Sequence, residues 1–215
     1  MTTLFVGDVH GCAEELQTLI DETQPSRVFL TGDLFSKGPS PCAVWEIIQE
    51  YDCLAVMGNH DHWFTANHSS PRLKPRLREL LDRYPEVISY INGLPFHRLI
   101  STGDREIVLI HAGVHPLLGL KGTDDEMAMV MRTFPVDGGT EHWYDSGWQG
   151  PELIVFGHDA RVGLVQRYEG SERVALGLDT GCVYGGPLTG WVQETDEFVT
   201  ATPKRRYHKG SIAPT

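Results

Sequence analysis

The chain has 215 residues, a length that suits one domain with a sizeable hydrophobic core. Its apolar content of 40% and charged content of 22% are ordinary for a soluble globular protein. The formal net charge of -11 argues against a nucleic-acid backbone or an anionic membrane as the main partner. An anionic substrate can still bind where local cations or metal ions outweigh this field.

The cysteines Cys12, Cys42, Cys53 and Cys182 are scattered and form no C-x-x-C pair. This spacing predicts reduced thiols, without a disulfide framework or a zinc knot. The N-terminus shows no basic segment followed by a long apolar one, and no apolar run approaches the roughly 18 residues of a membrane span. We therefore expect a soluble protein of the cytoplasm.

The first part of the chain alternates apolar strands with amphipathic helices. Strands are predicted at Leu4–Val6, Arg27–Thr31 and Leu54–Met57, where short apolar runs end in turn residues. Helices are predicted at Ala13–Glu22 and Pro41–Tyr51, from apolar residues at helical spacing. Strand, helix, strand, helix, strand predicts a parallel sheet with right-handed crossovers.

In the second part of the chain, predicted strands replace the alternation of strands and helices. After an interrupted helical stretch at 63–84, strong strands are predicted at Glu106–Ile110 and Leu153–Phe156. Four shorter segments separated by turn residues predict an antiparallel meander at 163–168, 173–178, 188–194 and 198–202. We expect a single domain over residues 1–202 and a flexible basic tail at 203–215.

Five of the apolar strands end in a glycine-containing tip that carries metal-ligating side chains. These side chains are Asp8 and His10, Asp33, Asn59 and His60, His111, and His158. Because open sheets keep their sites at the carboxyl ends of strands, the tips are expected to meet. Oxygen and imidazole ligands without thiolates suit manganese, iron, zinc, cobalt or nickel better than copper.

The ligands divide into two sets with one shared member. Asp8 and His10 alternate along an extended segment and can chelate one divalent ion. A second ion can be held by Asn59, His111 and His158, with Asp33 bridging the two. A bridged pair of ions would activate a water and clamp a phosphoryl group. His60 is then the candidate proton donor to the leaving group, and Asp61 the residue that orients its imidazole and raises its pKa.

The motifs carry a family resemblance. Gly7-Asp8-Val9-His10-Gly11, then Gly32-Asp33, then Gly58-Asn59-His60-Asp61 resembles the signature of calcineurin-like metallophosphoesterases of the phosphoprotein-phosphatase type. His111-Ala112-Gly113 and Gly157-His158-Asp159 look like the two later histidine motifs. The resemblance spans roughly residues 4–195 and implies an α/β (α+β) fold, a β-sandwich flanked by helices.

The second motif departs from the protein phosphatases of this family, which carry Asp and Arg where this chain has Ser36 and Lys37. Without the acid the cation loses its partner, and Lys lacks the bidentate fork of Arg. Together with the run 177–189, this departure is similar to the symmetrical diadenosine tetraphosphate hydrolase branch. The resemblance implies substrate-binding roles for Lys37, Arg132 and Tyr184, while Arg132 also fits a surface helix.

The main functional prediction is a two-metal hydrolase, with manganese as the leading ion, that cleaves dinucleoside polyphosphates such as diadenosine tetraphosphate. The alternative is a protein serine/threonine phosphatase, which would make the partner a phosphoprotein. A third interpretation is a metal-binding scaffold without catalysis, which the intact His60-Asp61 pair disfavours. The aromatics Trp143, Tyr144 and Trp148 could stack an adenine, although such residues more often pack in the interior.

Overall fold

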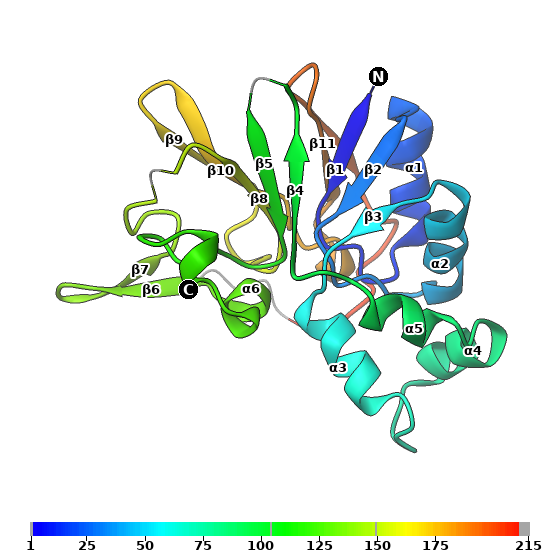
Figure 1. Ribbon diagram of the computed structural model, residues 1–215. Helices are drawn as coiled ribbons and strands as arrows, with labels where there is room; N and C mark the ends of the chain where they lie inside the picture. The colour runs from blue at the N-terminus through cyan, green and yellow to red at the C-terminus, as the bar shows by residue number, and fades with distance from the viewer. Residues whose placement is uncertain (1, 104, 149, 211–215) are drawn as a thin grey trace.

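The computed structural model describes residues 2–103, 105–148 and 150–210. Two five-stranded sheets stack face to face, and helices cover the outer face of the first (Figure 1). This arrangement confirms the predicted β-sandwich flanked by helices.

The first sheet has the order β12-β11-β1-β2-β3. Its parallel half contains β1 (Thr3–Val6), β2 (Arg27–Leu30) and β3 (Leu54–Ala55), as the alternation of strands and helices predicts. Its antiparallel half adds β11 (Leu188–Val192) and β12 (Glu197–Ala201). Because β1, β2 and β3 are parallel, the loops that follow them lie at one edge of the sandwich.

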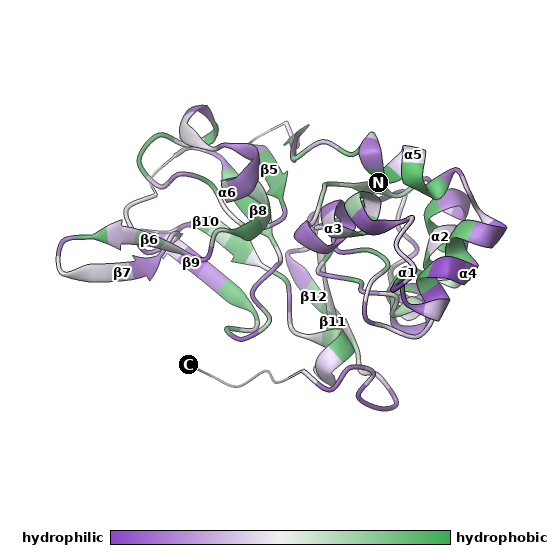
Figure 2. Ribbon diagram, turned by 90° about the horizontal axis from the view of Figure 1, so that it is seen from below, coloured by the Kyte–Doolittle hydropathy of each residue, from purple (hydrophilic) through white to green (hydrophobic). Residues whose placement is uncertain are grey.

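Helices α1 (Ala13–Thr23) and α2 (Pro41–Glu50) connect these parallel strands. They form one hydrophobic cluster with α4 (Pro75–Arg83) and α5 (Val87–Asn92) against the first sheet. Proline at the first position of α2 and α4 is favourable, because its fixed φ suits the helix and its missing N–H would be unpaired there anyway. Figure 2 shows hydrophilic and hydrophobic residues mixed along α2 and α4, and apolar residues such as Val44, Ile48 and Leu80 are the ones that these helices bury.

The second sheet has the order β4-β5-β8-β10-β9. Its strands are β4 (His97–Ser101), β5 (Glu106–Ile110), β8 (Leu153–Phe156), β9 (Val165–Glu169) and β10 (Glu172–Gly177). All four residues of β8 are buried, as expected for a central strand covered on both faces. The polar edge strand β4 was not predicted, because its exposed side chains give it a weak apolar pattern.

A layer of buried apolar side chains between the sheets holds them together. Phe5 of β1 stacks on Phe29 of β2 with ring centroids 5.0 Å apart, and it contacts Trp191 of β11 at 5.3 Å. The same cluster contains Leu109 of β5 and Val155 of β8, both fully buried. Each such side chain contributes roughly 1.5–3 kcal/mol of burial free energy. This packing between the two faces holds the strand ends of one sheet in position beside those of the other.

Three sequence predictions need correction. The expected meander is divided, because β9 and β10 pair in the second sheet whereas β11 and β12 pair in the first. The interrupted helical stretch begins earlier than predicted, because α3 (Asn59–Asn67) starts before Trp63, while Pro71 lies in the turn before α4, as the interruption predicts. The third strand stops at Ala55, so Val56 and Met57 lead into the site as a loop.

Several short elements outside the sandwich were not predicted. They are 3-10 turns at Leu120–Gly122 (η1) and Cys182–Tyr184 (η2), helix α6 (Asp125–Val130), and a hairpin of β6 (Thr133–Val136) and β7 (Gly139–His142). With the second sheet, α6 and β6 contribute to a separate hydrophobic cluster. This cluster contains several aromatic residues that the sequence analysis offered for substrate binding.

Residues 203–210 contact helix α1 and the turn η2. The Tyr207 hydroxyl donates to Glu15 of α1 at 2.8 Å, and the Tyr207 amide donates to the carbonyl of Val183 at 3.1 Å. Residues 211–215 of the predicted tail lie outside the described residues, so the division into one domain and a flexible tail stays a prediction. Within the part of the chain that is described, no helix combines the length and apolarity needed to cross a membrane.

Candidate active site

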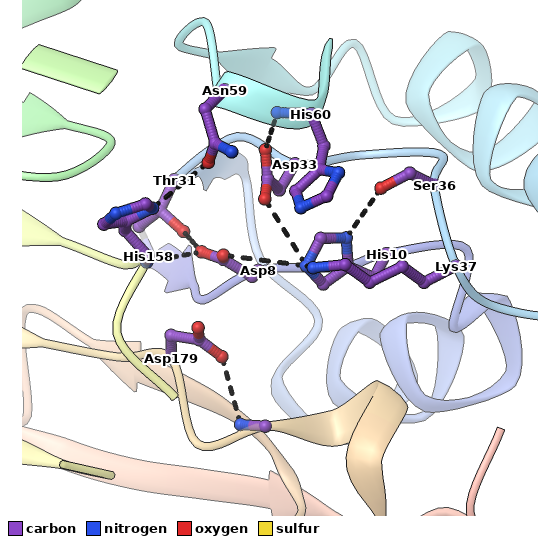
Figure 3. A network of polar contacts seen from close by, with 12 residues as sticks. Asp8, His10, Thr31, Asp33, Ser36, Lys37, Asn59, His60, His158 and Asp179 are labelled. Atoms are coloured by element: carbon purple, nitrogen blue, oxygen red, sulfur yellow. Dashed lines mark hydrogen bonds and ion pairs between the residues drawn. The ribbon is translucent and has the colours of Figure 1, made fainter. Parts of the chain in front are cut away.

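The predicted ligand side chains meet at the carboxyl edge of the sandwich (Figure 3). The loops after β1 and β2 supply Asp8, His10 and Asp33, and the first residue of α3 is Asn59. The second sheet supplies His111 directly after β5 and His158 after β8. All six predicted metal ligands are therefore brought together, and the site spans both layers of the sandwich.

The loops hold several of these residues in an uncommon backbone conformation. His10, Asp33, Lys37 and His158 have φ angles of 46°, 53°, 69° and 71°. A positive φ costs a residue with a side chain roughly 1–3 kcal/mol, and it persists only where the surrounding structure enforces it. Clustering of such strain at one edge of the fold is typical of functional sites.

Two glycines allow the loops to close on the carboxylates. A Cβ atom at Gly58 would lie 2.3 Å from Asp33 Oδ1, and one at Gly157 would lie 2.0 Å from Asp8 Oδ1. Neither distance is sterically possible, so both positions require glycine. The glycines in these motifs therefore admit the carboxylates, in addition to forming turns.

Asp33 lies between the two ligand sets. Its Oδ2 is 3.4 Å from His10 Nε2, and its Oδ1 is 3.6 Å from His111 Nε2. Asp33 also belongs to two groups of ligand atoms that could hold an ion, one with Asp8 and His111 and one with His10 and His60. This position is the one expected for a bridging carboxylate.

The second ligand set presents lone pairs that face one another. His111 Nδ1 lies 2.8 Å from the carbonyl of Thr31, and His158 Nε2 lies 3.1 Å from the carbonyl of Val130. These ring nitrogens must carry the protons, because carbonyls only accept. The other nitrogens, His111 Nε2 and His158 Nδ1, therefore direct lone pairs at Asn59 Oδ1, 3.1 Å from each. Three lone-pair-bearing atoms, one oxygen and two nitrogens, therefore face one another with no proton between them, which is the arrangement expected of ligands to a cation.

His10 is oriented in the same way by the second motif. Lys37 Nζ lies 3.0 Å from His10 Nε2, and an ammonium can only donate. His10 Nε2 therefore carries a lone pair, and its Nδ1 donates to Ser36 Oγ at 3.0 Å. Ser36, which the sequence analysis treated only as a lost acid, fixes the tautomer of a ligand histidine.

The site gathers more buried carboxyl groups than its own cations balance. Burial raises the pKa of Asp8 well above its ordinary value, and Asp179 and Asp33 raise it further. Burial also raises the pKa of Asp179 to about 6. Burial opposes ionisation of Asp33 too, but His111 and His10 outweigh it and its pKa is lowered. An excess of buried acid beside oriented histidines suits divalent cations.

His60 and Asp61 lie at the first turn of α3 and point in different directions. The His60 amide donates to Asp33 Oδ1 at 2.8 Å, and its ring lies 5.2 Å from the ring of His10. The Asp61 carboxylate instead accepts the backbone N–H groups of Leu34 and Gly58. The predicted orientation of His60 by Asp61 is therefore wrong, because successive helical side chains diverge by about 100°.

The pKa of His60 also departs from the prediction. Burial lowers it below the ordinary value, and the charge of Asp33 only partly opposes that shift. Asp61 contributes a cap to α3, since its carboxylate accepts the backbone N–H of the N-cap residue Gly58 at 3.2 Å.

A cavity of about 150 Å³ opens over the ligands. Lys37, Arg132 and Tyr184, the predicted substrate-binding residues, all line it. The Lys37 ammonium lies 5.3 Å from the centre of the Tyr184 ring. Arg132 Nε makes no hydrogen bond among the described residues but lies 3.6 Å from Asp159 Oδ2, a loose ion pair. Arg161, which the sequence analysis missed, also lines the cavity and pairs with Asp159 at 2.7 Å.

The aromatics predicted to stack an adenine do not reach this cavity. Trp143 is 1% exposed, and Tyr144 and Trp148 are 8% and 7% exposed. Trp143 packs against Phe156 beneath the second sheet, and its indole donates to the carbonyl of Ala112. The stacking prediction is therefore wrong, because these three side chains pack in the interior instead of lining the cavity.

Asp179 was missed as a site residue, although it was within reach of the same reasoning. It is 6% exposed, follows β10 at the same edge, and lines the cavity beside Asp8. Its sequence, Gly177-Leu178-Asp179, repeats the pattern of a carboxylate just after a strand. No comparable sequence pattern marks Arg161, because it lies in a loop and lines the cavity beside its ion-pair partner Asp159.

A family model for calcineurin-like phosphoesterases matches residues 1–180. The chain therefore belongs to the calcineurin-like phosphoesterase family, the class that the sandwich and the ligand cluster define.

Relatives named symmetrical bis(5'-nucleosyl)-tetraphosphatase share sequence with it. The protein of Erwinia tasmaniensis is 35% identical over 126 residues, covering 54% of this chain and 46% of the relative. That of Azotobacter vinelandii is 36% identical over 131 residues, covering 56% and 47%. The chain thus spans about half the length of these curated relatives. The crystal structure of a "putative diadenosine tetraphosphatase" superposes with a TM-score of 0.77 at 30% identity, covering 94% of this chain and 93% of the other.

Proposed function

We propose that this protein hydrolyses a phosphoanhydride bond of dinucleoside polyphosphates such as diadenosine tetraphosphate. The observation that carries the proposal is Asp33, which lies between two histidine-containing ligand sets at the base of a cavity lined by cations. That combination suits a phosphorylated substrate and two divalent ions. The names of the relatives support a nucleotide as the substrate.

The ligand geometry supports a division between two ions. Asp8, His10 and Asp33 would hold the first; Asp33, Asn59, His111 and His158 would hold the second. Two divalent ions, with manganese as our first choice and cobalt, iron, zinc or nickel as alternatives, would supply an acidified water and neutralise phosphate charge when bound.

The remaining residues bind and protonate. Lys37 and Arg132 reach the cavity from opposite loops and would contact phosphate oxygens, with Tyr184 under the lysine. In the reaction, a water oxygen bonds to phosphorus and the bridging P–O bond breaks toward the leaving nucleotide. His60 lies at the cavity wall and would donate a proton to that leaving oxygen. Asp61 would act indirectly, by holding α3 against the Asp33 loop.

The second motif supports a nucleotide over a phosphoprotein. Ser36 occupies the position at which the protein phosphatases of this family carry an acid, and its hydroxyl accepts a hydrogen bond from His10. Lys37, which contacts His10 Nε2, offers a point charge without the bidentate fork of an arginine. The free thiols of Cys12, Cys42, Cys53 and Cys182 further support a reducing compartment, and we propose the cytoplasm.

The deciding experiment compares kcat/KM for diadenosine tetraphosphate and for a phosphoserine peptide, with the purified protein loaded with Mn²⁺. We expect the nucleotide to be preferred by at least about tenfold, a difference of roughly 1.4 kcal/mol in transition-state binding. Chelator should abolish turnover and Mn²⁺ should restore it. A preference for the peptide, or turnover that survives chelation, would contradict the proposal.

A further inference from the structure

A second, larger cavity adjoins the metal-ligand site. Its volume is about 480 Å³, within the roughly 300–1,000 Å³ typical of ligand pockets. It is lined by Ser36, Lys37, Asn59, His60, Trp63, Lys74, Leu77 and His208. Lys37, Asn59 and His60 also line the first cavity, so the two cavities meet at the candidate proton donor.

The aromatic wall of this cavity is Trp63. It is 45% exposed, which is unusual for the largest apolar side chain, and the core does not need it because α3 buries Phe64 instead. Trp63 follows His60 by three residues on α3, so both side chains occupy one face of the helix. An indole held beside the proton donor, with nearly half of its surface exposed, offers a platform for a flat ring.

The lining of the cavity also includes cations. Lys37 and Lys74 line it, and no carboxylate is present among its lining residues. Among the described residues, Lys74 has no ion-pair partner, whereas Lys204 pairs with Glu14 at 2.8 Å. In a chain of net charge -11, a lysine without an ion-pair partner among the described residues, beside an exposed tryptophan, marks a site for a molecule that has both a ring and negative charge.

We propose that this cavity binds the nucleoside of the leaving nucleotide, with the base stacked on Trp63 and its phosphates beside Lys74. This inference rests on the proposed function and adds a subsite to it. The leaving side is assigned because Trp63 lies one helical turn from His60, which would protonate the leaving oxygen. His208 closes the cavity from the C-terminal segment, and its ring lies 5.8 Å from that of Tyr184.

The test compares Trp63→Ala and Trp63→Phe with His62→Ala, an exposed neighbour on α3 that does not line the cavity. Each Mn²⁺-loaded variant is assayed with diadenosine tetraphosphate and with tripolyphosphate, which has no base. We expect Trp63→Ala to lower kcat/KM for the nucleotide roughly 5- to 150-fold, mainly through KM. Trp63→Phe should restore most of this loss, and tripolyphosphate turnover should change less than about twofold.

A second measurement does not depend on turnover. ADP binding is measured by calorimetry and by tryptophan fluorescence, with pyrophosphate as the base-free probe. The wild-type protein should bind ADP more tightly than pyrophosphate, and Trp63→Ala should remove that difference while His62→Ala retains it. If diadenosine tetraphosphate is not cleaved but this ADP pattern appears, the proposed function fails and the subsite stands.

Three results would overturn the subsite. Trp63→Ala could leave both the nucleotide KM and ADP binding unchanged. It could reduce tripolyphosphate turnover as much as nucleotide turnover, which would indicate displacement of α3. The wild-type protein could also bind ADP no better than pyrophosphate, which would leave the cavity without a role in base recognition.

Discussion

The Asp61 carboxylate accepts the backbone N–H of Leu34 at 2.9 Å, and this bond joins helix α3 to the loop that carries Asp33. The same carboxylate accepts the Gly58 amide at 3.2 Å. Asp61 is 1% exposed, so its partners within the fold take the place of water. A residue next to the candidate proton donor therefore serves to position two ligand loops.

Asp61→Ala is expected to destabilise the protein, because two buried N–H groups lose their acceptor. The loss should be about 1.5–3 kcal/mol in the free energy of unfolding, measured by urea denaturation of the metal-free protein. His62→Ala, at the next and exposed position, should change stability by less than about 0.5 kcal/mol. Equal stability of the two variants would return Asp61 to a direct role beside His60.

Asp33→Asn is expected to disturb both ions, because Asp33 faces both ligand sets. Metal content after dialysis against Mn²⁺, measured by mass spectrometry, should fall from two ions per chain to one or fewer. Glu172→Gln removes an acid that is 75% exposed on β10 and should leave the content unchanged. Two tightly bound ions and near-normal turnover in Asp33→Asn would show that the bridging assignment is wrong.

Lys37→Ala is expected to weaken phosphate binding. The lost charge-assisted contact corresponds to about 1.5–3 kcal/mol, or roughly 10- to 150-fold in kcat/KM. Lys204→Ala is the matched control, because that lysine is 82% exposed and pairs with Glu14 far from the cavity. An unchanged KM and kcat in Lys37→Ala would mean that the ammonium only orients His10.

Arg132→Ala is expected to raise KM for the nucleotide by roughly tenfold, because the Arg132 guanidinium lines the cavity and holds Asp159 through a loose ion pair of 3.6 Å without a hydrogen bond from Nε. Steady-state kinetics at saturating Mn²⁺ gives the measurement. Arg161 offers a contrast, since its guanidinium already makes two hydrogen bonds to Asp159. If Arg161→Ala raises KM and Arg132→Ala does not, the phosphate contact belongs to Arg161.

His60→Asn separates proton donation from metal binding. A general acid contributes typically ~10²–10⁴-fold and matters most when the leaving group is poor. The variant should therefore lose most activity on alkyl phosphates and less on diadenosine tetraphosphate, whose leaving oxygen is weakly basic. A series of substituted phenyl phosphates should show a steeper dependence of rate on leaving-group pKa.

Metal content decides the alternative role of His60, whose ring nitrogen belongs to a possible ligand group with His10 and Asp33. Retention of two ions in His60→Asn would support proton donation. Loss of an ion, or equal losses on good and poor leaving groups, would make His60 a ligand.

The parallel half of the first sheet was predictable because each of its strands and helices has a local pattern. Apolar residues at helical spacing predict α1, and Pro41 marks the start of α2. The partners of the later strands were not predictable, because alternation identifies a strand without naming its neighbour. The chain leaves the second sheet after Gly177 and enters the first at Leu188, and no local signal marks that crossing.

The ligands of the site were predictable for a similar reason, since a carboxylate or imidazole after a strand keeps its position when the strand pairs. Contacts between side chains were not. Adjacency in sequence suggested that Asp61 orients His60, but the helix turns the two side chains apart. The tautomer of His10 depends on Ser36, twenty-six residues away, which only the folded loops bring into contact.

The candidate ligands come from both layers of the sandwich, with Asp8, Asp33 and Asn59 on one side and His111 and His158 on the other. Ions bound there would join the two sheets at one edge, where the structure otherwise brings together repelling carboxyl groups. Metal ions that bind the folded protein but not the unfolded chain stabilise the folded state by mass action. Metal supply would then set the lifetime of the folded protein as well as its activity, so that a metal-starved cell would lose the enzyme itself through unfolding and degradation.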